Sequence, residues 1–453
     1  MRKLVYVALL SCASTALGTT MLGAQTGNGE TAARQHAAEV RVRQQLHSPY
    51  FEGLYSRTYW SLINRMDPNG YVPESLTGAY HGMFPRTIGA LSLLFLETGR
   101  VNEAEKSIGC VLRVMKQNNQ ELVPHVIGKS GNRYTIRDDE FEIDGQATLI
   151  LGWARLAQRR GRTTFEDQTW NQVSALMSRT TSRAFLDYGG FPSQLGLVRN
   201  GAFEHSREGR YWDTYDLLTQ SFVGAALKSM AAVAQRRGDT QKANEWEGKL
   251  AILSKGVTKN LTTVRDGKLT YLEMRLPNSA AGVPYLGLGW VAFSPVAAGW
   301  EPDADPQVMQ NTVATMQHSL IKVTHGIPWM PTDSYADGRF SDQIIGKGQA
   351  WEMDYSRTHG DYIRIEQILR LIEEANGTSS LYMEGAWLQD PQHNLKISSL
   401  LRDSDLPGLE HASWKVVNAG NGEQTVWWCW AMARLRRQMG MPAEPAKPAP
   451  LPN

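Results

Sequence analysis

Apolar residues recur at helical spacing through most of the chain, and the apolar runs end repeatedly at a glycine that can close a helix. Each interval between these glycines has room for two helices of ordinary length with their loops. The intervals are 62, 77, 61, 78 and 63 residues, between Gly99, Gly161, Gly238, Gly299, Gly377 and Gly440. The pattern therefore predicts a repeated helical hairpin.

The two helices of each predicted hairpin differ in polarity. The runs before the glycines have apolar faces, as at Ile88, Leu91 and Phe95, whereas segments 101–116 and 240–255 carry many charges. Apolar helices that alternate with amphipathic helices are expected to form an inner ring covered by an outer ring. We therefore predict an all-α fold, a single (α/α)6 barrel of six helical hairpins over residues 25–441.

The alternatives to a barrel are an irregular helical domain and an open solenoid of helix pairs. Against a solenoid, the loops that lead into the apolar helices are long and rich in aromatic and acidic residues, as in segments 124–144, 189–219 and 332–357. Long loops gathered on one face of a barrel are where a binding site is expected. Short β-ribbons are expected in these regions, for example around residues 265–273.

The two ends of the chain are predicted to lie outside the barrel. The first 24 residues are typical of a secretory signal peptide, with Arg2 and Lys3 before an apolar stretch and small residues after it. An exported protein, periplasmic or extracellular, is therefore expected, with lipid anchoring at Cys12 as the alternative. No later stretch reaches the roughly 18 continuous apolar residues of a membrane span. Five prolines in residues 442–453 predict an extended, mobile tail.

The charge balance and the cysteine content exclude several classes of function. Lysine and arginine number 47 against 45 acidic residues, and loss of the signal peptide would leave 45 of each. A balanced chain has no net field to attract nucleic acid or anionic lipid. Cys110 and Cys429 lie in apolar helical contexts and are expected to be two buried thiols. The sequence has no Gly-rich phosphate loop and no GxSxG, HExxH or EF-hand motif, so nucleotide chemistry, serine-hydrolase chemistry and zinc proteolysis are not expected.

Six acidic or amide side chains fall within residues 138–146, at the start of a predicted inner helix. Such crowding is unfavourable unless the side chains bind a cation or hydrogen-bond donors, and their spacing does not fit a calcium loop. Sugar hydroxyls are the expected donors, which makes Asp144 a candidate substrate-binding residue. The alternative is that Asp144 caps the helix.

A second acidic segment lies just ahead of the next inner helix. Asp213 follows Trp212, and an aromatic neighbour that desolvates a carboxyl raises its pKa toward that of a general acid. Asp216 is three residues further on, so one of the two is expected to face substrate. The other is expected to cap the helix, and Thr219 is an equal candidate for the cap. We take Asp213 as the candidate general acid and Trp212 as a candidate substrate-binding residue.

Two further segments combine carboxylates with tryptophan. Glu423 opens the last helix, where the helix dipole holds a carboxylate ionised, as a general base requires; a helix cap is the alternative. Trp427, one turn later, is a candidate for stacking on a sugar ring. In segment 348–357, Trp351 is a second candidate for stacking, and Glu352 is a candidate substrate-binding residue and a rival for either catalytic role.

Four segments, in this order, resemble the inverting (α/α)6 glycosidases, most nearly glycoside hydrolase family 15, the glucoamylases. Segment 84–87 (Phe-Pro-Arg-Thr) resembles the family's Trp-x-Arg-Asp strip, and segment 143–149 resembles its Asn-Asp-Gly-Pro-Ala segment. Segment 212–213 is similar to the Trp-Glu that carries the general acid, and segment 422–424 to the Glu-Gln that supplies the general base. Thr87 stands where the family has Asp. Asp213 stands where it has Glu, although related families with the same barrel pair an Asp acid with a Glu base.

The resemblance implies an inverting, exo-acting hydrolase that cleaves a terminal sugar, such as an α-glucoside or related neutral glycoside, from an oligosaccharide or polysaccharide. Asp213 would protonate the leaving oxygen and Glu423 would activate a water, with about 6.5–9.5 Å between the two carboxyls. Arg86, Asp144 and Trp351 would hold the sugar, and this reaction would need neither a metal nor an organic cofactor. The alternatives are an (α/α)6 polysaccharide lyase or unsaturated uronyl hydrolase, which would need basic subsites, and a non-catalytic glycan-binding protein, which the Thr87 replacement would suit.

Overall fold

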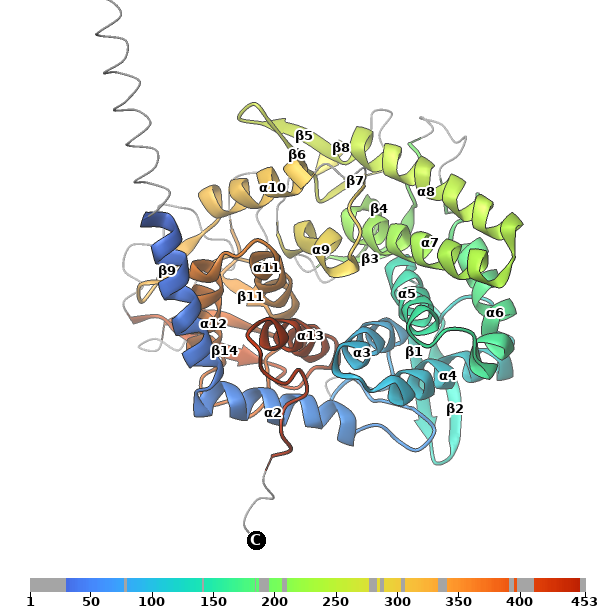
Figure 1. Cartoon of the computed structure of the whole chain (residues 1–453), viewed down its shortest axis with the longest axis horizontal. Coiled ribbons are helices and arrows are strands. Elements are labelled where there is room, and N and C mark those ends of the chain that lie inside the picture. Colours follow the sequence, from blue (N-terminus) through green and yellow to red (C-terminus); the bar gives the residue numbers. More distant parts are fainter. Residues whose placement is uncertain are drawn as a thin grey trace, which may run out of the picture.

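The computed structural model describes residues 30–76, 80–140, 142–183, 185–186, 195–205, 210–276, 283–285, 289–302, 306–332, 340–390, 395–396 and 411–448. The predicted signal peptide, residues 1–24, lies outside the described residues. Within them, helices form most of the structure and lie in two concentric rings (Figure 1).

The inner ring consists of helices that are buried on nearly all sides. In chain order its members are α3 (Pro85–Thr98), α5 (Ile143–Arg160), α7 (Leu217–Arg237), η1 with α9 (Trp290–Phe293 and Ser294–Ala298), α11 (Gly346–Thr358) and α13 (Gly422–Gln438). Each member packs against the next, and α13 packs against α3, so the ring closes (Figure 1). Closure excludes the open solenoid.

The outer ring covers these helices with amphipathic ones. Its members are α2 (Pro49–Asn64), α4 (Val101–Gln117), α6 (Thr164–Thr180), α8 (Thr240–Asn260), α10 (Pro306–Ser319) and α12 (Tyr362–Asn376). In α4 the buried residues Ala104, Ile108, Val111 and Met115 recur every three or four positions, which directs one stripe inward. The predicted (α/α)6 barrel is confirmed.

Glycines end the inner helices largely as predicted. All six glycines of the sequence pattern have positive φ, a conformation that costs glycine little and other residues more. One assignment differs: Gly377 follows the outer helix α12, and the inner helix α11 is followed instead by Gly360, also at positive φ. Glycine also allows α3 to approach α5, because a Cβ on Gly89 would lie 2.4 Å from the Thr148 carbonyl carbon.

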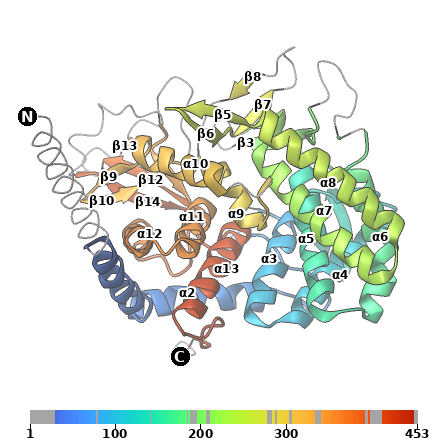
Figure 2. The same ribbon diagram turned by 45° about the horizontal axis from the view of Figure 1, so that its top comes forward.

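Short antiparallel sheets are built on the loops that lead into the inner helices. They comprise β1 (Val126–Ser130) with β2 (Arg133–Asp138); β3 (Asn200–His205), β4 (Arg210–Asp216), β7 (Met274–Leu276) and β8 (Val283–Tyr285); β5 (Thr262–Arg265) with β6 (Lys268–Tyr271); β9 (Lys322–Thr324) with β10 (Ile327–Trp329); and β11 (Gln343–Ile345), β12 (Gly385–Asp390), β13 (Leu395–Lys396) and β14 (Ser413–Val417). In Figure 2 strands β5 to β8 lie together at the top, and strands β9, β10, β12, β13 and β14 lie together beside α10 and α12. The β5–β6 hairpin confirms the ribbon expected around residues 265–273.

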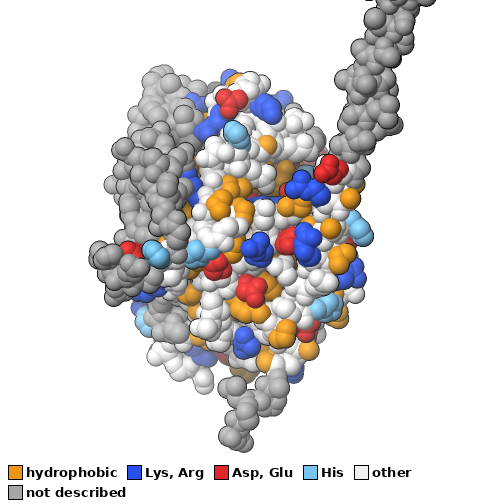
Figure 3. All heavy atoms as spheres, turned by 90° about the vertical axis from the view of Figure 1, so that its left-hand side faces the viewer, with side chains coloured by type: hydrophobic (Ala, Val, Ile, Leu, Met, Phe, Trp, Pro, Cys, Tyr) orange, Lys and Arg blue, Asp and Glu red, His pale blue; other side chains and the backbone are white. Residues whose placement is uncertain are grey.

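Helix α7 is the one described helix that is long and apolar enough to cross a membrane by length and composition alone. Its position in the inner ring accounts for that apolarity, because 89% of its most apolar window is buried inside the protein. On the face shown in Figure 3, basic and acidic side chains are interspersed and do not form one patch. Cys110 and Cys429 are both buried and unpaired, as predicted.

Part of the predicted tail contacts the barrel in the structure. Residues 443–446 are held against α2 by hydrogen bonds to their backbone carbonyls: the Tyr55 hydroxyl donates to Ala443 (2.6 Å) and Ser56 Oγ donates to Ala446 (2.7 Å). Arg100 forms an ion pair with Glu444 (2.8 Å). Because prolines leave carbonyls free to accept hydrogen bonds, an extended segment can still be fixed. Residues 449–453 lie outside the described residues.

Candidate functional site

A cavity of about 370 Å³ lies where the inner helices begin. Glu423, Arg86 and Lys347 reach it from the first turns of α13, α3 and α11. The described residues that line it are Glu74, Tyr80, Phe84, Arg86, Thr87, His125, Trp290, Thr332, Gln343, Ile344, Ile345, Lys347, Glu384, Gly385, Trp387, Val417, Asn421, Glu423 and Gln424. This volume is typical of a small-molecule site.

Glu423 is held between two cations. Lys347 Nζ donates to Glu423 Oε1 (3.0 Å), and Arg86 Nε lies 3.4 Å from the same oxygen. Lys347 also lies over the Trp290 ring, 4.2 Å from its centroid, which fixes the ammonium group. Burial alone would raise the pKa of Glu423, but the charges of Arg86 and Lys347 outweigh burial and lower it below its usual range. Glu423 is therefore a buried carboxylate that stays ionised.

A second carboxyl group, that of Glu74, is hydrogen-bonded to the backbone of Glu423. Glu74 Oε1 accepts the Glu423 backbone N–H (2.8 Å), and the Thr87 side chain also hydrogen-bonds to Glu74. Thr87 is the position where the sequence departs from the resemblance to glucoamylases, and in the structure the carboxyl group of Glu74 lies beside it. Burial and the charge of Glu423 raise the pKa of Glu74 to about 7, against the opposing hydrogen bonds. Only glycine fits at 422, where a Cβ would lie 2.8 Å from Glu74 Oε2.

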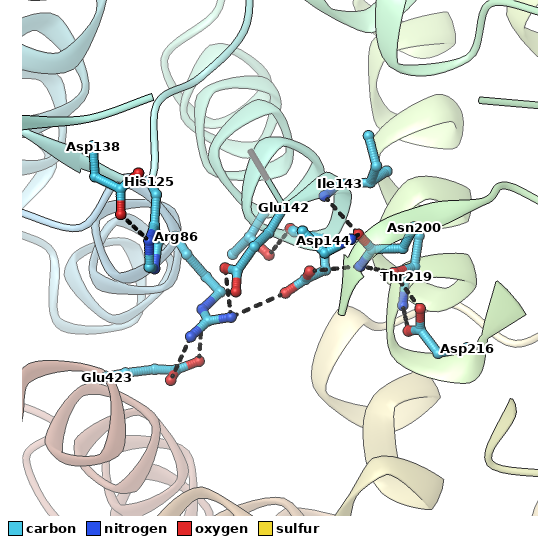
Figure 4. A network of polar contacts seen from close by, with 12 residues as sticks. Arg86, His125, Asp138, Glu142, Ile143, Asp144, Asn200, Asp216, Thr219 and Glu423 are labelled. Atoms are coloured by element: carbon cyan, nitrogen blue, oxygen red, sulfur yellow. Dashed lines mark hydrogen bonds and ion pairs between the residues drawn. The ribbon is translucent and has the colours of Figure 1, made fainter. Parts of the chain in front are cut away.

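Arg86 joins Glu423 to a polar network on the opposite side (Figure 4). Its Nη1 donates to Glu142 Oε2 (2.8 Å) and, more weakly, to Asp144 Oδ2 (3.5 Å). Asn200 Nδ2 in turn donates to Asp144 Oδ1 (3.2 Å). Asp144 is buried and is not among the described residues that line the cavity, so its contact with substrate stays a prediction. Its described side-chain contacts are with Arg86 and Asn200.

Asp216 ends this network as a helix cap. Its Oδ1 accepts the backbone N–H of Thr219 at the start of α7 (2.6 Å), and its Oδ2 accepts the Thr219 hydroxyl (2.8 Å). Burial and the negative charge of Asp144 raise the pKa of Asp216 to about 7. The prediction that one of the two aspartates caps this helix is confirmed, and the capping residue is Asp216.

Asp213 lies elsewhere in the loop. Both of its carboxylate oxygens accept hydrogen bonds from Arg199 (2.7 and 2.5 Å), and its side chain is 31% exposed. It is not among the described residues that line the cavity. Its role as general acid therefore stays a prediction. The side chain of Trp212 lies outside the described part of the structure.

Three predicted substrate-binding residues are buried within the barrel. Trp351 and Trp427 are 1% and 2% exposed, and their rings pack against each other at 5.2 Å in the centre of the inner ring. Glu352 is 1% exposed and forms two hydrogen bonds with Arg364 of α12 (2.7 and 3.1 Å). They are not among the described residues that line the cavity, because they lie deeper along the inner helices than the first turn, so their contact with sugar stays a prediction.

Glu384 is a cavity residue that sequence reasoning missed. It precedes β12, and its carboxyl accepts hydrogen bonds from the Tyr80 hydroxyl (2.9 Å) and from Asn418 Nδ2 (2.7 Å). Burial raises the pKa of Glu384, and the charge of Glu423 adds to that effect. No sequence motif surrounds Glu384. The only feature in the sequence that could have indicated it is the position of a carboxylate three residues before Trp387, a residue of β12. Glu74, Lys347 and His125 were missed for the same reason.

The described residues offer no group of three or more His, Cys, Asp or Glu side chains that would hold a metal ion. His125 lines the cavity, but its Nδ1 faces Asp138 (3.1 Å) and its ring meets the edge of Phe84. The chemistry that the site offers is acid–base chemistry, from carboxyl groups whose environments shift their pKa values in opposite directions.

Comparison with known proteins identifies the fold. No family model matches the chain, and no curated protein does. A solved structure named as a wild-type glycosidase has 15% sequence identity and a TM-score of 0.57 over 84% of this chain and 96% of its own. A bacterial glucoamylase in complex with acarbose has 14% identity and a TM-score of 0.58 over 86% of this chain. The match spans only 56% of the glucoamylase's length.

A metal-independent α-mannosidase of Streptococcus pneumoniae, in a non-productive complex with α-1,6-mannobiose, has 13% identity and a TM-score of 0.56. That match covers 88% of this chain and 97% of the mannosidase. The chain thus has the fold of the (α/α)6 glycosidases, and the resemblance found in the sequence is confirmed at the level of the fold.

Proposed function

We propose that the protein is an inverting glycoside hydrolase that removes a terminal neutral sugar, such as an α-glucoside, from an oligosaccharide or polysaccharide. The observation that carries the proposal is Glu423, a buried carboxylate held ionised by Arg86 and Lys347 in a cavity of sugar-binding size. The similar structures support it, because their names describe glycosidases and two of them are named as complexes with acarbose or with α-1,6-mannobiose.

Glu423 acts as the general base in this proposal. A water on one face of the sugar gives its proton to Glu423 while its oxygen attacks the anomeric carbon, and the leaving oxygen departs from the opposite face. The lowered pKa keeps Glu423 able to accept that proton in mildly acidic solution. The backbone hydrogen bond to Glu74 fixes the first turn of α13, so the carboxylate does not swing away.

The proton donor is either Glu384 or Asp213. Glu384 lines the cavity and its raised pKa keeps it protonated to higher pH than an ordinary glutamate, which favours it as the donor. Asp213 has the sequence resemblance in its favour, but it must first leave Arg199. Variants Glu384→Gln and Asp213→Asn separate them. The donor's variant should lose at least about a hundredfold on substrates with poor leaving groups and little on activated aryl glycosides.

The test of the function is hydrolysis by the purified protein of a panel of α- and β-linked oligosaccharides, with the product anomer followed by NMR. We expect release of a terminal sugar with inverted configuration and a loss of at least about a hundredfold in turnover for Glu423→Gln. Retention of configuration, or normal turnover in Glu423→Gln on a poor leaving group, would refute the assignment.

A lyase or uronyl hydrolase is disfavoured by the charges at the cavity. Such enzymes need a cation to neutralise the uronate, and here Arg86 and Lys347 are engaged by Glu142 and Glu423. Incubation with acidic polysaccharides, monitored by absorbance near 235 nm, tests this alternative. Binding without any turnover would instead support the non-catalytic glycan-binding protein.

A further inference from the structure

A larger cavity, of about 1010 Å³, lies at the other end of the inner ring. Its walls are the last turns of α3, α5 and α13 together with α9 and Gly299. The first turns of α3 and α13 carry Arg86 and Glu423, so these two helices run from one cavity to the other. Among the described residues, the two cavities have no lining residue in common.

The cavity exists because one member of the inner ring is short. Helices α5 and α13 have 18 and 17 residues, whereas the corresponding member consists of the four-residue η1 and the five-residue α9. The difference leaves this member about 10 Å shorter than α13. Helix α9 ends at Gly299, and its last residues together with Gly299 line the cavity.

Arginine side chains dominate the polar lining of this cavity. Arg434 and Arg437 of α13 both contact the carboxylate of Glu97 (3.0 and 2.6 Å). Glu97 is the only acidic residue among the described lining residues, which also include Arg155 and Arg159 of α5. Four guanidinium groups and one carboxylate therefore line the cavity, and Arg434 also pairs with the buried Asp354 behind the lining (3.0 Å).

Arg155 and Arg159 lie one turn apart on α5, and neither has an ion pair or a side-chain hydrogen bond within the described part of the chain. Arg155 is partly buried, and burial lowers the pKa of its guanidinium group. A partly buried cation without a counter-ion is unfavourable, because it loses hydration without gaining a partner. The pair is thus available to a ligand from outside the chain.

Helix ends account for only part of this charge. A helix C-terminus carries about half a negative charge, so basic residues are favoured in the last turns of α3, α5 and α13. Three such ends offset about one and a half positive charges. The four arginines outnumber Glu97 and Asp354 by two, so the cavity remains positive.

We propose that this cavity is a second binding site, separate from the catalytic one, for a small organic anion that carries a carboxylate or a phosphate group. Arg155 and Arg159 bind the oxyanion, since a guanidinium fork matches the oxygens of either group. Leu93, Leu96 and Leu151 form the apolar wall beside them and contact the rest of the ligand.

The test is calorimetric titration of the full chain with inorganic phosphate and with acetate, at constant ionic strength set by sodium chloride. We expect saturable binding of at least one anion to the wild type and at least about tenfold weaker binding to Arg155→Met. Arg133→Met serves as the matched control, because Arg133 lies exposed on the β1–β2 hairpin, away from the cavity, and its loss should leave binding unchanged.

Two outcomes overturn the proposal: saturable binding that is equal in the wild type and Arg155→Met, or no saturable binding of either anion. If Arg155→Met does not fold, Arg159→Met on the exposed neighbouring turn provides the same comparison. Thermal unfolding without anion is a second readout. Arg155→Met should then be at least as stable as the wild type, because the substitution removes a cation that has no partner.

Discussion

The buried carboxyl group of Glu74 makes the stability of the protein depend on pH in a defined way. Its pKa rises from 4.5 to about 7 on folding, a shift of about 2.5 units and so about 3 kcal/mol. The unfolded chain releases this proton near pH 4.5, whereas the folded protein keeps it to about pH 7. The folded state therefore binds more protons between these values, and this group's contribution to stability falls as pH rises from 4.5 through 7.

Glu74→Gln removes the ionisation and retains a carbonyl oxygen that can accept the Glu423 backbone N–H. Any cost of placing the buried amide beside Gly422 is independent of pH. We therefore compare the free energy of unfolding of the variant with that of the wild type. The variant's value minus the wild type's value should rise by about 3 kcal/mol from pH 4.5 to pH 8, whatever this difference is at pH 4.5.

Urea denaturation at pH 4.5, 6 and 8 measures this difference through the free energy of unfolding. Glu140→Gln, on an exposed loop residue, is the matched control and should follow the wild type at all three pH values. A difference between Glu74→Gln and the wild type that does not change with pH would refute the reasoning, because Glu74 would then ionise as it does in the unfolded chain.

Three other expectations follow from the contacts described above. Lys347→Met should raise the pKa of Glu423, so the acidic limb of the kcat/KM profile should move to higher pH; an unmoved limb would mean that Lys347 does not keep the base ionised. Gly89→Ala should destabilise the protein by about 1–3 kcal/mol, because its Cβ would overlap the Thr148 backbone, whereas Gly248→Ala, with no atom within 4 Å, should cost nothing. Truncation after residue 441 should lower the thermal midpoint, and an unchanged midpoint would show that the contacts of residues 443–446 with α2 are not stabilising.

The sequence by itself determined the architecture of this protein. Helical periodicity and helix-ending glycines depend on contacts between neighbours in the chain, so the closed barrel, its alternating helices and most of its helix ends could be predicted. The placement of Arg86 and Glu423 at the first turns of inner helices was predictable for the same reason, because the barrel brings those turns to one end.

Only the tertiary structure decided which polar groups share the site. Glu74 meets Glu423 across 349 positions, and no pattern near either residue indicates the contact. Trp351, Trp427 and Glu352 have the local sequence of substrate-binding residues, yet they lie in the core because the depth of a residue along a helix depends on how the helices are packed. The charge state of each carboxyl group is also decided by the tertiary structure. Its pKa depends on burial and on charges from other hairpins, which exist only once the ring has closed.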